Sequence, residues 1–407
     1  MPEEFKFVHA ADFHLDDQME GLAELPTHLK QSIANSPYAA ARGVFDLAIS
    51  EAVDFVLLSG DLLDLEQSGC RASAFLLSQF ERLAEKNIRV YWCGGEVDYP
   101  DRWPTAVELP KNVQTFSAAA VDEFVVERRG KALATIIASG FDHRRRGIGE
   151  FVVEAAAPFP IVLTHGQLDS VVLAAKHVRY WALGGQHKPS LVDRSTAWVA
   201  FPGTPQARRP EETGAHGCHL VRVDGTGTVR TQFVELDTVR WMPQKLALAE
   251  SSTPDQIREL LTDRALKLIS EHPEQTLLVT WQLSPSGEFN PQLRQYRLQQ
   301  ETLKWLRDEF GRSEQGIWSI SLSYDPPAAL PASWYEEDTI LGDYLRALGR
   351  YQGDESIGLA LHDYLPRSIK ADAAADVLRL QGEERASVLS AAGLLGVEYL
   401  TANREVA

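Results

Sequence analysis

The sequence of 407 residues predicts an α/β protein: a sandwich of two β-sheets, then a small α/β lobe and a helical tail. Three observations predict this class. Helix-like and strand-like segments alternate at the start of the chain, many short strand-like segments follow up to residue 240, and helix–strand pairs return after it. Because strands outnumber helices in the middle of the chain, two packed sheets fit better than one doubly wound sheet.

The first segments show clear periodicities. Phe5–Ala10 alternates as a strand does, and Ala39–Ala52 has the apolar spacing of a helix. Asp54–Ser59 is a short apolar run, typical of a strand buried on both faces. A helix over Ala72–Lys86 is expected to lead into a strand over Ile88–Cys93. The later strands are expected at Phe124–Glu127, Ala132–Ser139, Ile161–Thr164, Tyr180–Leu183 and Ala197–Phe201, with a hairpin over Cys218–Leu236.

A domain boundary is predicted near Trp241–Pro243, so that the first domain spans residues 1–240. Residues 241–325 form the predicted α/β lobe, and a proline-rich linker, Asp325–Pro331, separates it from the helical tail of residues 332–407. The lobe contains the expected elements Pro254–His272, Thr276–Gln282, Pro291–Phe310 and Gly316–Tyr324. The apolar spacing of the tail suits either core packing or a docking face for a partner protein.

The composition limits the classes of function. A net charge of −17 opposes a protein that holds DNA over its whole surface, since phosphate contacts require basic residues. No apolar run approaches the roughly 18–20 residues that span a bilayer, and the acidic start MPEEFKFVHA is unlike a signal peptide. Three cysteines without a C-x-x-C pair fit a reducing compartment. We therefore expect a cytoplasmic protein without a membrane partner.

Four short segments place Asp or His directly after a predicted strand. Strand ends in α/β folds point into the loop layer where sites form, so we expect these side chains to converge. They are Asp12, His14, Asp61, His165 and His187. Any one segment alone would be explained as a hydrogen-bonded loop, but buried, unpaired carboxylates and imidazoles at four strand ends would be costly. Imidazole and carboxylate ligands without thiolates suit Mn²⁺, Fe or catalytic Zn²⁺.

At these positions the sequence resembles a known family. The segments HAADFHLD, DFVLLSGDLLD, VYWCGGEVD, IVLTHG and YWALGGQHKP resemble the ordered motifs of calcineurin-like metallophosphoesterases, most closely the bacterial SbcD- and YhaO-type DNA-repair exonuclease subunits. The segment FPGTPQARRPEETGAHGCHLVRVD extends the similarity to about residue 240. The resemblance implies a four-layer α/β-β/α sandwich, a hydrolase acting on DNA, and Mn²⁺ as cofactor. It also implies a DNA-capping lobe, a tail that docks an SbcC-like coiled-coil ATPase, and allows a homodimer.

The resemblance implies two metal sites, one of which is incomplete. The first metal would have Asp12, His14, His187 and the bridging Asp61, all of which are present. The second retains Asp61 and His165 only, because two further ligands of the family correspond to Gly95 and Gly185. The family's general-acid histidine corresponds to Glu96.

Two accounts of this loss remain open. Either Glu96, or Asp98 if the loop is shifted by one residue, replaces a missing ligand, or the protein binds one metal and catalyses weakly or not at all. Glu96 would act as a catalytic proton donor only if it were buried.

Short basic clusters offer candidate phosphate contacts, namely Arg144, Arg145 and Arg208, although solvated surface charge explains them equally well. Three functions follow. One is a metal-dependent phosphodiesterase of the DNA-repair exonuclease type with reduced activity. The second is a weakly catalytic or non-catalytic metal-binding subunit of a DNA-repair ATPase complex. The third is a phosphoesterase acting on small phosphodiesters or phosphoproteins.

Overall fold

The computed structural model describes residues 3–22, 24–99, 103, 107–118, 120–141, 151, 153–166, 168, 177–193, 197–249, 252–285, 296–313, 315–325, 330–364 and 380–401. The chain divides into two compact units. The first unit comprises Met1–Met242, Ile269–Val279 and Arg312–Trp318, and the second comprises Pro243–Leu268, Thr280–Gly311 and Ser319–Ala407. The predicted division into three domains is not tested by these units and stays a prediction.

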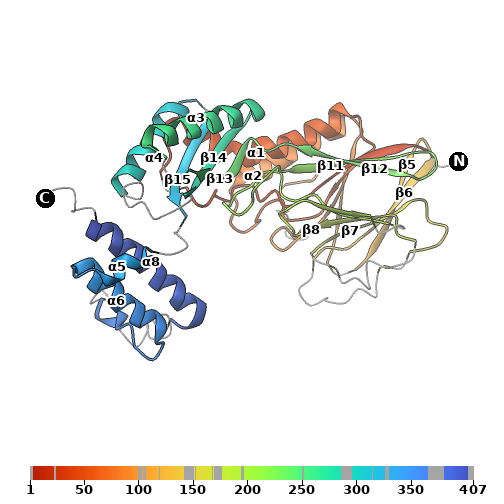
Figure 1. Ribbon diagram of the computed structural model, residues 1–407. Helices are drawn as coiled ribbons and strands as arrows, with labels where there is room; N and C mark the ends of the chain where they lie inside the picture. The colour runs from red at the N-terminus through yellow and green to blue at the C-terminus, as the bar shows by residue number, and fades with distance from the viewer. Residues whose placement is uncertain are drawn as a thin grey trace. The chain divides into compact units, whose positions relative to one another are not determined.

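The first sheet has six strands in the order β12-β11-β1-β2-β3-β4 (Figure 1). Its strands β1 to β4 are parallel, and β11 pairs antiparallel with β1. The carboxyl ends of β1, β2 and β3 therefore meet at one edge. The strands are β1 Phe5–Ala10, β2 Phe55–Leu58, β3 Arg89–Cys93, β4 Val113–Phe116, β11 Gly217–Val223 and β12 Val229–Glu235.

The second sheet also has six strands, in the order β5-β6-β7-β8-β10-β9. The central strands β6, β7, β8 and β10 are parallel. The strands are β5 Asp122–Arg128, β6 Lys131–Ala138, β7 Pro160–His165, β8 Tyr180–Gly184, β9 Ser190–Asp193 and β10 Trp198–Phe201. Aromatic rings fill the space between the sheets: Phe7 stacks on Phe55 at 5.0 Å and meets Tyr180 edge-on at 5.2 Å.

Two helices cover the outer face of the first sheet. They are α1 Thr27–Ser50 and α2 Cys70–Glu85. Helix α1 begins well before the predicted Ala39 and runs through Pro37, because Leu29 and Ile33 extend the buried face at helical spacing. The predicted α/β sandwich is confirmed. No helix covers the outer face of the second sheet within the part of the chain that the structure describes; residues 142–150 and 169–176 lie outside that part.

The small lobe follows the predicted alternation. It contains β13 Val239–Leu248, α3 Pro254–Glu271, β14 Thr276–Pro285, α4 Tyr296–Phe310 and β15 Ile317–Tyr324. The strands form a sheet in the order β13-β14-β15, and α3 and α4 lie on one face of it (Figure 1). Strand β13 passes through the predicted boundary at Trp241–Pro243 without a break, although the division between the two compact units also falls after Met242.

The tail contains α5 Ala332–Glu336, α6 Ile340–Gly353, the 3-10 turn Leu361–Tyr364 and α8 Gly382–Thr401. Leu345 of α6 and Val397 of α8 are fully buried in a common apolar cluster. Helix α8 also has an exposed side, on which Val388, Leu395 and Tyr399 are 40%, 54% and 72% exposed. These three residues, the α8 stripe, are seven and four positions apart and so share one helix face.

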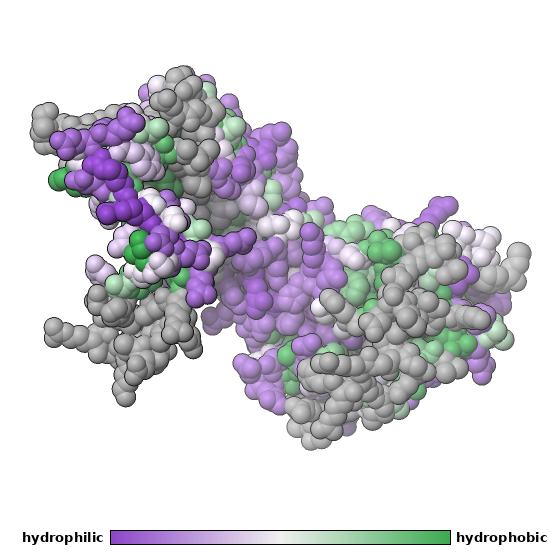
Figure 2. Space-filling model, turned by 60° about the horizontal axis from the view of Figure 1, so that its bottom comes forward, coloured by the Kyte–Doolittle hydropathy of each residue, from purple (hydrophilic) through white to green (hydrophobic). Residues whose placement is uncertain are grey.

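None of the helices among the described residues has the length and apolarity needed to cross a bilayer. On the face drawn in Figure 2 the described surface is mainly hydrophilic, with hydrophobic residues in small separate groups.

Candidate metal centre

The two sheets bring five side chains together at the carboxyl ends of their parallel strands. Asp12 and His14 follow β1, Asp61 follows β2, and His165 and His187 lie at or after the ends of β7 and β8. Asp12, His14 and Asp61 have φ angles of 56°, 43° and 56°. This left-handed backbone is uncommon for residues with a side chain and concentrates at functional sites.

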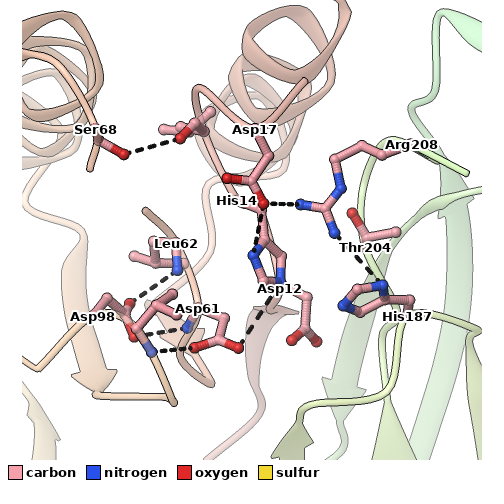
Figure 3. Close-up of polar contacts among 12 residues, drawn as sticks. Asp12, His14, Asp17, Asp61, Leu62, Ser68, Asp98, His187, Thr204 and Arg208 are labelled. Atoms are coloured by element: carbon pink, nitrogen blue, oxygen red, sulfur yellow. Dashed lines mark hydrogen bonds and ion pairs between the residues drawn. The ribbon is translucent and has the colours of Figure 1, made fainter. Parts of the chain in front are cut away.

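The five predicted residues converge. Figure 3 shows four of them, Asp12, His14, Asp61 and His187. Their ligand atoms form two trios in which all atoms lie within 4.8 Å of one another: Asp12, His14 and His187, and Asp12, Asp61 and His165. Asp12 belongs to both trios, whereas the resemblance implied Asp61 as the shared residue. Asp61 Oδ2 nevertheless lies 3.8 Å from His14 Nε2 and 3.4 Å from His165 Nε2.

Two buried imidazole nitrogens in this cluster lack a hydrogen-bond partner among the described residues, namely Nε2 of His14 and Nε2 of His165. Each faces the carboxylate of Asp61 without hydrogen-bond geometry. A buried polar atom without a partner is unfavourable unless an ion or water satisfies it. The donor set, two carboxylates and three imidazoles, therefore fits a divalent transition metal ion.

The electrostatics of the cluster favour positive charge at its centre. Burial raises the pKa of Asp12, although His165 and His14 oppose it. Burial also acts to raise the pKa of Asp61, but His165, His14 and the Val97 N–H together outweigh burial and bring this pKa to about 2. Burial acts to lower the pKa of His165, and Asp61 outweighs it, so the pKa is about 9. The carboxylates thus stabilise a positive charge here, whether a proton or a metal cation.

Neighbouring groups orient three side chains of the centre through hydrogen bonds. The backbone N–H of Gly185 donates to both oxygens of Asp12 at 3.0 Å. His165 Nδ1 donates to the carbonyl of Ser59 at 2.7 Å, which leaves its Nε2 free. His187 Nδ1 lies 2.6 Å from Glu212 Oε1.

Burial acts to raise the pKa of Glu212, but hydrogen bonds from His187 and the Arg208 N–H bring it to about 2. The sequence analysis missed Glu212, although it lies in the segment that resembles the family, four residues after Arg208.

Gly95 and Gly185, where the family resemblance implies ligands, are tightly enclosed. A Cβ at Gly95 would lie 2.3 Å from Asp61 Oδ1, and a Cβ at Gly185 would lie 2.9 Å from His165 Nε2. Gly185 also has a φ of 85°, which disfavours any side chain. The backbone at these two positions therefore lies too close to Asp61 and His165 to leave room for a side chain.

Asp98 does not act as a replacement ligand, which corrects that prediction. Its carboxylate accepts four hydrogen bonds at 2.6–3.0 Å, from the N–H groups of Asp61, Leu62 and Gly95 and from Trp92 Nε1. Figure 3 shows the two from Asp61 and Leu62. Four donors occupy all four lone-pair directions of a carboxylate. Asp98 is thus a buried anchor of the loop that carries Asp61.

Glu96 is exposed and belongs to neither trio of ligand atoms. The burial that Glu96 would need to act as a proton donor is absent, and its roles as proton donor and replacement ligand stay predictions. One oxygen of Asp61 is also engaged, since Oδ1 accepts a hydrogen bond from the N–H of Val97 at 3.0 Å. Asp61 Oδ2 is the oxygen that faces the histidines.

A pocket of about 420 Å³ opens beside His14 and His187. Arg208 and Arg209 line it together with Asp16, Asp17 and Glu20, so its charges of both signs are mixed. Arg208 is buried and its Nη1 donates to Asp17 Oδ2 at 3.2 Å. The other predicted phosphate contacts, Arg144 and Arg145, lie outside the described residues.

Comparison with known proteins gives consistent results. The family model described as calcineurin-like phosphoesterase matches residues 5–189. The uncharacterized metallophosphoesterase YhaO of Bacillus subtilis (strain 168) is 32% identical over 347 residues, which cover 79% of this chain and 82% of that protein. A dimetal phosphatase from Danio rerio is 13% identical, over 54% of this chain and 93% of its own, with a TM-score of 0.37. A protein of Thermus thermophilus is 14% identical, over 56% and 98%, with a TM-score of 0.33.

Proposed function

The chain belongs to the calcineurin-like metallophosphoesterase family, and from this premise we propose that it binds one divalent metal ion and slowly hydrolyses phosphodiester bonds in DNA. The observation that carries the proposal is a pair of buried nitrogens without a hydrogen-bond partner among the described residues. These are His14 Nε2 and His165 Nε2, which face the Asp61 carboxylate. A cation at this place would satisfy both nitrogens, which are otherwise buried without a hydrogen bond.

Asp12, His14 and His187 would hold the ion, with Asp61 Oδ2 as a further ligand. A divalent ion supplies Lewis acidity at the phosphate and lowers the pKa of a nearby water, and Mn²⁺ suits this ligand set. The chain's own contribution is positioning. The Gly185 N–H orients Asp12, the Val97 N–H orients Asp61, and the Ser59 carbonyl orients His165.

We infer slow turnover because the second trio, Asp12, Asp61 and His165, offers a second ion fewer ligands than the family resemblance implies. Gly95 and Gly185 provide no side-chain ligand atoms, and Asp61 Oδ1 accepts the Val97 N–H. The exposed Glu96 lacks the burial that it would need to replace the family's general acid. Loss of a general acid typically lowers a rate by about 10²–10⁴-fold.

DNA is the proposed substrate because of the similarity of the motifs to DNA-repair exonuclease subunits. The net charge of −17 means that the protein needs help to hold DNA, so we also propose a partner, an SbcC-like coiled-coil ATPase. The α8 stripe supports this partner, since Val388, Leu395 and Tyr399 present an apolar helix face to solvent.

The test is a cleavage assay with Mn²⁺ on labelled DNA and on bis(p-nitrophenyl) phosphate, with and without the ATPase. We expect weak DNA cleavage that is abolished in His14→Ala and unchanged in His28→Ala, whose imidazole is exposed on α1. Metal binding without any cleavage would instead support the non-catalytic subunit. Cleavage of the small ester alone would support a phosphoesterase of small substrates, and the absence of metal binding would refute all three.

A further inference from the structure

Two of the imidazoles at the metal centre are each backed by a carboxylate that is not a ligand. His187 Nδ1 lies 2.6 Å from Glu212 Oε1, and His14 Nδ1 lies 3.4 Å from Asp17 Oδ2. The opposite nitrogen of His14, Nε2, lies 3.8 Å from Asp61 Oδ2 and has no hydrogen-bond partner among the described residues. The same carboxylate–imidazole arrangement therefore occurs twice, on ligands that come from different sheets.

One guanidinium joins the two carboxylates. Arg208 Nη1 donates to Asp17 Oδ2 at 3.2 Å, and the Arg208 backbone N–H donates to Glu212 Oε2 at 2.7 Å. Arg208 Nη2 lies 3.5 Å from His187 Nδ1 (Figure 3). Since Arg208 is buried, its charge offsets the two carboxylates and keeps them in place.

The arrangement selects one imidazole tautomer. Two groups meet His187 Nδ1: Glu212 Oε1 at 2.6 Å, which can only accept a hydrogen bond, and the Arg208 guanidinium at 3.5 Å, which can only donate one. The much shorter Glu212 contact holds the proton at Nδ1, and the Nε2 lone pair is left for a metal ion. Asp17 acts on His14 in the same sense, through a longer contact from an exposed position. Without these acceptors, a neutral imidazole would place its proton on either nitrogen. The Nε2–H form cannot offer Nε2 to a metal ion.

We propose that Glu212 and Asp17, coupled through Arg208, are positioning residues that fix the metal-binding tautomers of His187 and His14. They touch neither substrate nor metal and act through the histidines. The inference rests on the metal site of the proposed function. It also adds a role for Arg208 beyond contact with phosphate.

A purely structural alternative is that Glu212 only stabilises its own turn. Its Oε2 accepts the N–H groups of Arg208 and Arg209 at 2.7 and 3.3 Å, which is sufficient to hold a turn without any role for His187. The two roles differ in their consequences. A structural role changes the melting temperature, whereas a positioning role changes the His187 tautomer and the metal affinity.

Glu212→Gln separates them, with Glu211→Gln as the matched control, because Glu211 is the exposed neighbour. In Glu212→Gln the amide oxygen accepts the backbone N–H groups, and the amide NH₂ then faces His187 Nδ1 and favours the Nε2–H tautomer. We expect Mn²⁺ affinity, measured by titration calorimetry, to fall about 10–100-fold. We also expect long-range ¹H–¹⁵N spectra of the metal-free protein to report the change of tautomer.

Wild-type Mn²⁺ affinity in Glu212→Gln, or an unchanged tautomer with a lowered melting temperature, overturns the inference. If Glu212→Gln does not fold, Asp17→Asn takes its place, since Asp17 is exposed. A lower Mn²⁺ affinity at an unchanged melting temperature then supports the inference, and unchanged affinity overturns it. A wild-type protein that binds no Mn²⁺ refutes the proposed function, while the tautomer spectra still decide the positioning role.

Discussion

Asp98 connects the backbone of the Asp61 loop to the β3 strand through four hydrogen bonds. In Asp98→Asn the single amide oxygen accepts at most two of these donors, and the NH₂ group meets N–H groups. We expect the free energy of unfolding to fall by about 2–4 kcal/mol, since buried donors are left without acceptors. Thermal unfolding measures the effect. Glu96→Gln, the exposed control, should leave the melting temperature unchanged, and equal stability of both variants would refute the anchor role.

Gly95 tests whether the second metal site can be rebuilt. Gly95→Asn restores the family's ligand type, but its Cβ would lie 2.3 Å from Asp61 Oδ1. We expect the variant to be less stable and to bind no additional Mn²⁺, because the backbone must first move away from Asp61. Metal analysis of the purified variant gives the answer. A second ion in Gly95→Asn would show that the loop retains the geometry of a two-metal enzyme.

At the scale of single residues, the sequence predicted which side chains converge better than it predicted which residues hold them in place. Asp12, His14 and Asp61 follow strand ends, so the fold brings them together whatever the surrounding packing. The contact of Glu212 with His187 spans 25 residues and depends on the path of the intervening loop. Asp98 lies beside the predicted ligand position, and only its four donors reveal that it is an anchor and not a ligand.

At the scale of elements, β1 and β11 place two buried histidines directly opposite each other, His9 and His219. Burial lowers the pKa of His219 to about 4, and burial with the neighbouring His219 lowers the pKa of His9. An unfolded chain takes up these protons near pH 6.5. The unfolded state therefore binds more protons between pH 6.5 and 4, so stability is full above pH 6.5 and is lost as the pH falls towards 4.

We expect the free energy of unfolding to fall between pH 7 and pH 5, with about 2 kcal/mol from His219 alone. Urea unfolding at several pH values measures it. In His219→Gln this part of the pH dependence should disappear, because Gln has no proton to gain and still donates to the Phe201 carbonyl, as His219 Nε2 does. His28→Gln, exposed on α1, should keep the wild-type dependence. An identical slope in His219→Gln and wild type would contradict the assignment.

Helix α8 carries the prediction about the partner. The double variant Leu395→Ser/Tyr399→Ser removes apolar groups that are 54% and 72% exposed, so we expect it to fold normally and to lose co-purification with an SbcC-like coiled-coil ATPase. Leu266→Ser on α3, at 55% exposure, is the matched control and should retain binding. Undiminished co-purification of the double variant would remove α8 as the docking face.

Helices and strands were predictable where the periodic spacing of apolar residues was long and unbroken. Helix α2, strands β2 and β3, and the alternation in the small lobe follow from apolar spacing alone. The first turns of α1 were missed because they precede Pro37, a residue that usually ends a helix. Strands β4 and β9 have four residues each and take their strand conformation from pairing with β3 and β10, which a local pattern does not reveal.

At the scale of the whole molecule, the acidic net charge opposes DNA binding, whereas the proposed function of the metal centre requires it. The chain has a net charge of −17, and the pocket beside the metal centre mixes two arginines with three carboxylates. Such a surface gives little of the counterion release that holds proteins on DNA. The proposed partner would account for DNA binding, since it would supply the affinity for DNA while this chain supplies the metal centre.

The stoichiometry of bound Mn²⁺ tests the account most directly. Titration calorimetry of metal-free protein, checked by elemental analysis, should give one ion per chain in the wild type and none in His14→Ala. Two ions per chain would contradict the single-metal account, and no bound ion in the wild type would contradict the metal centre itself.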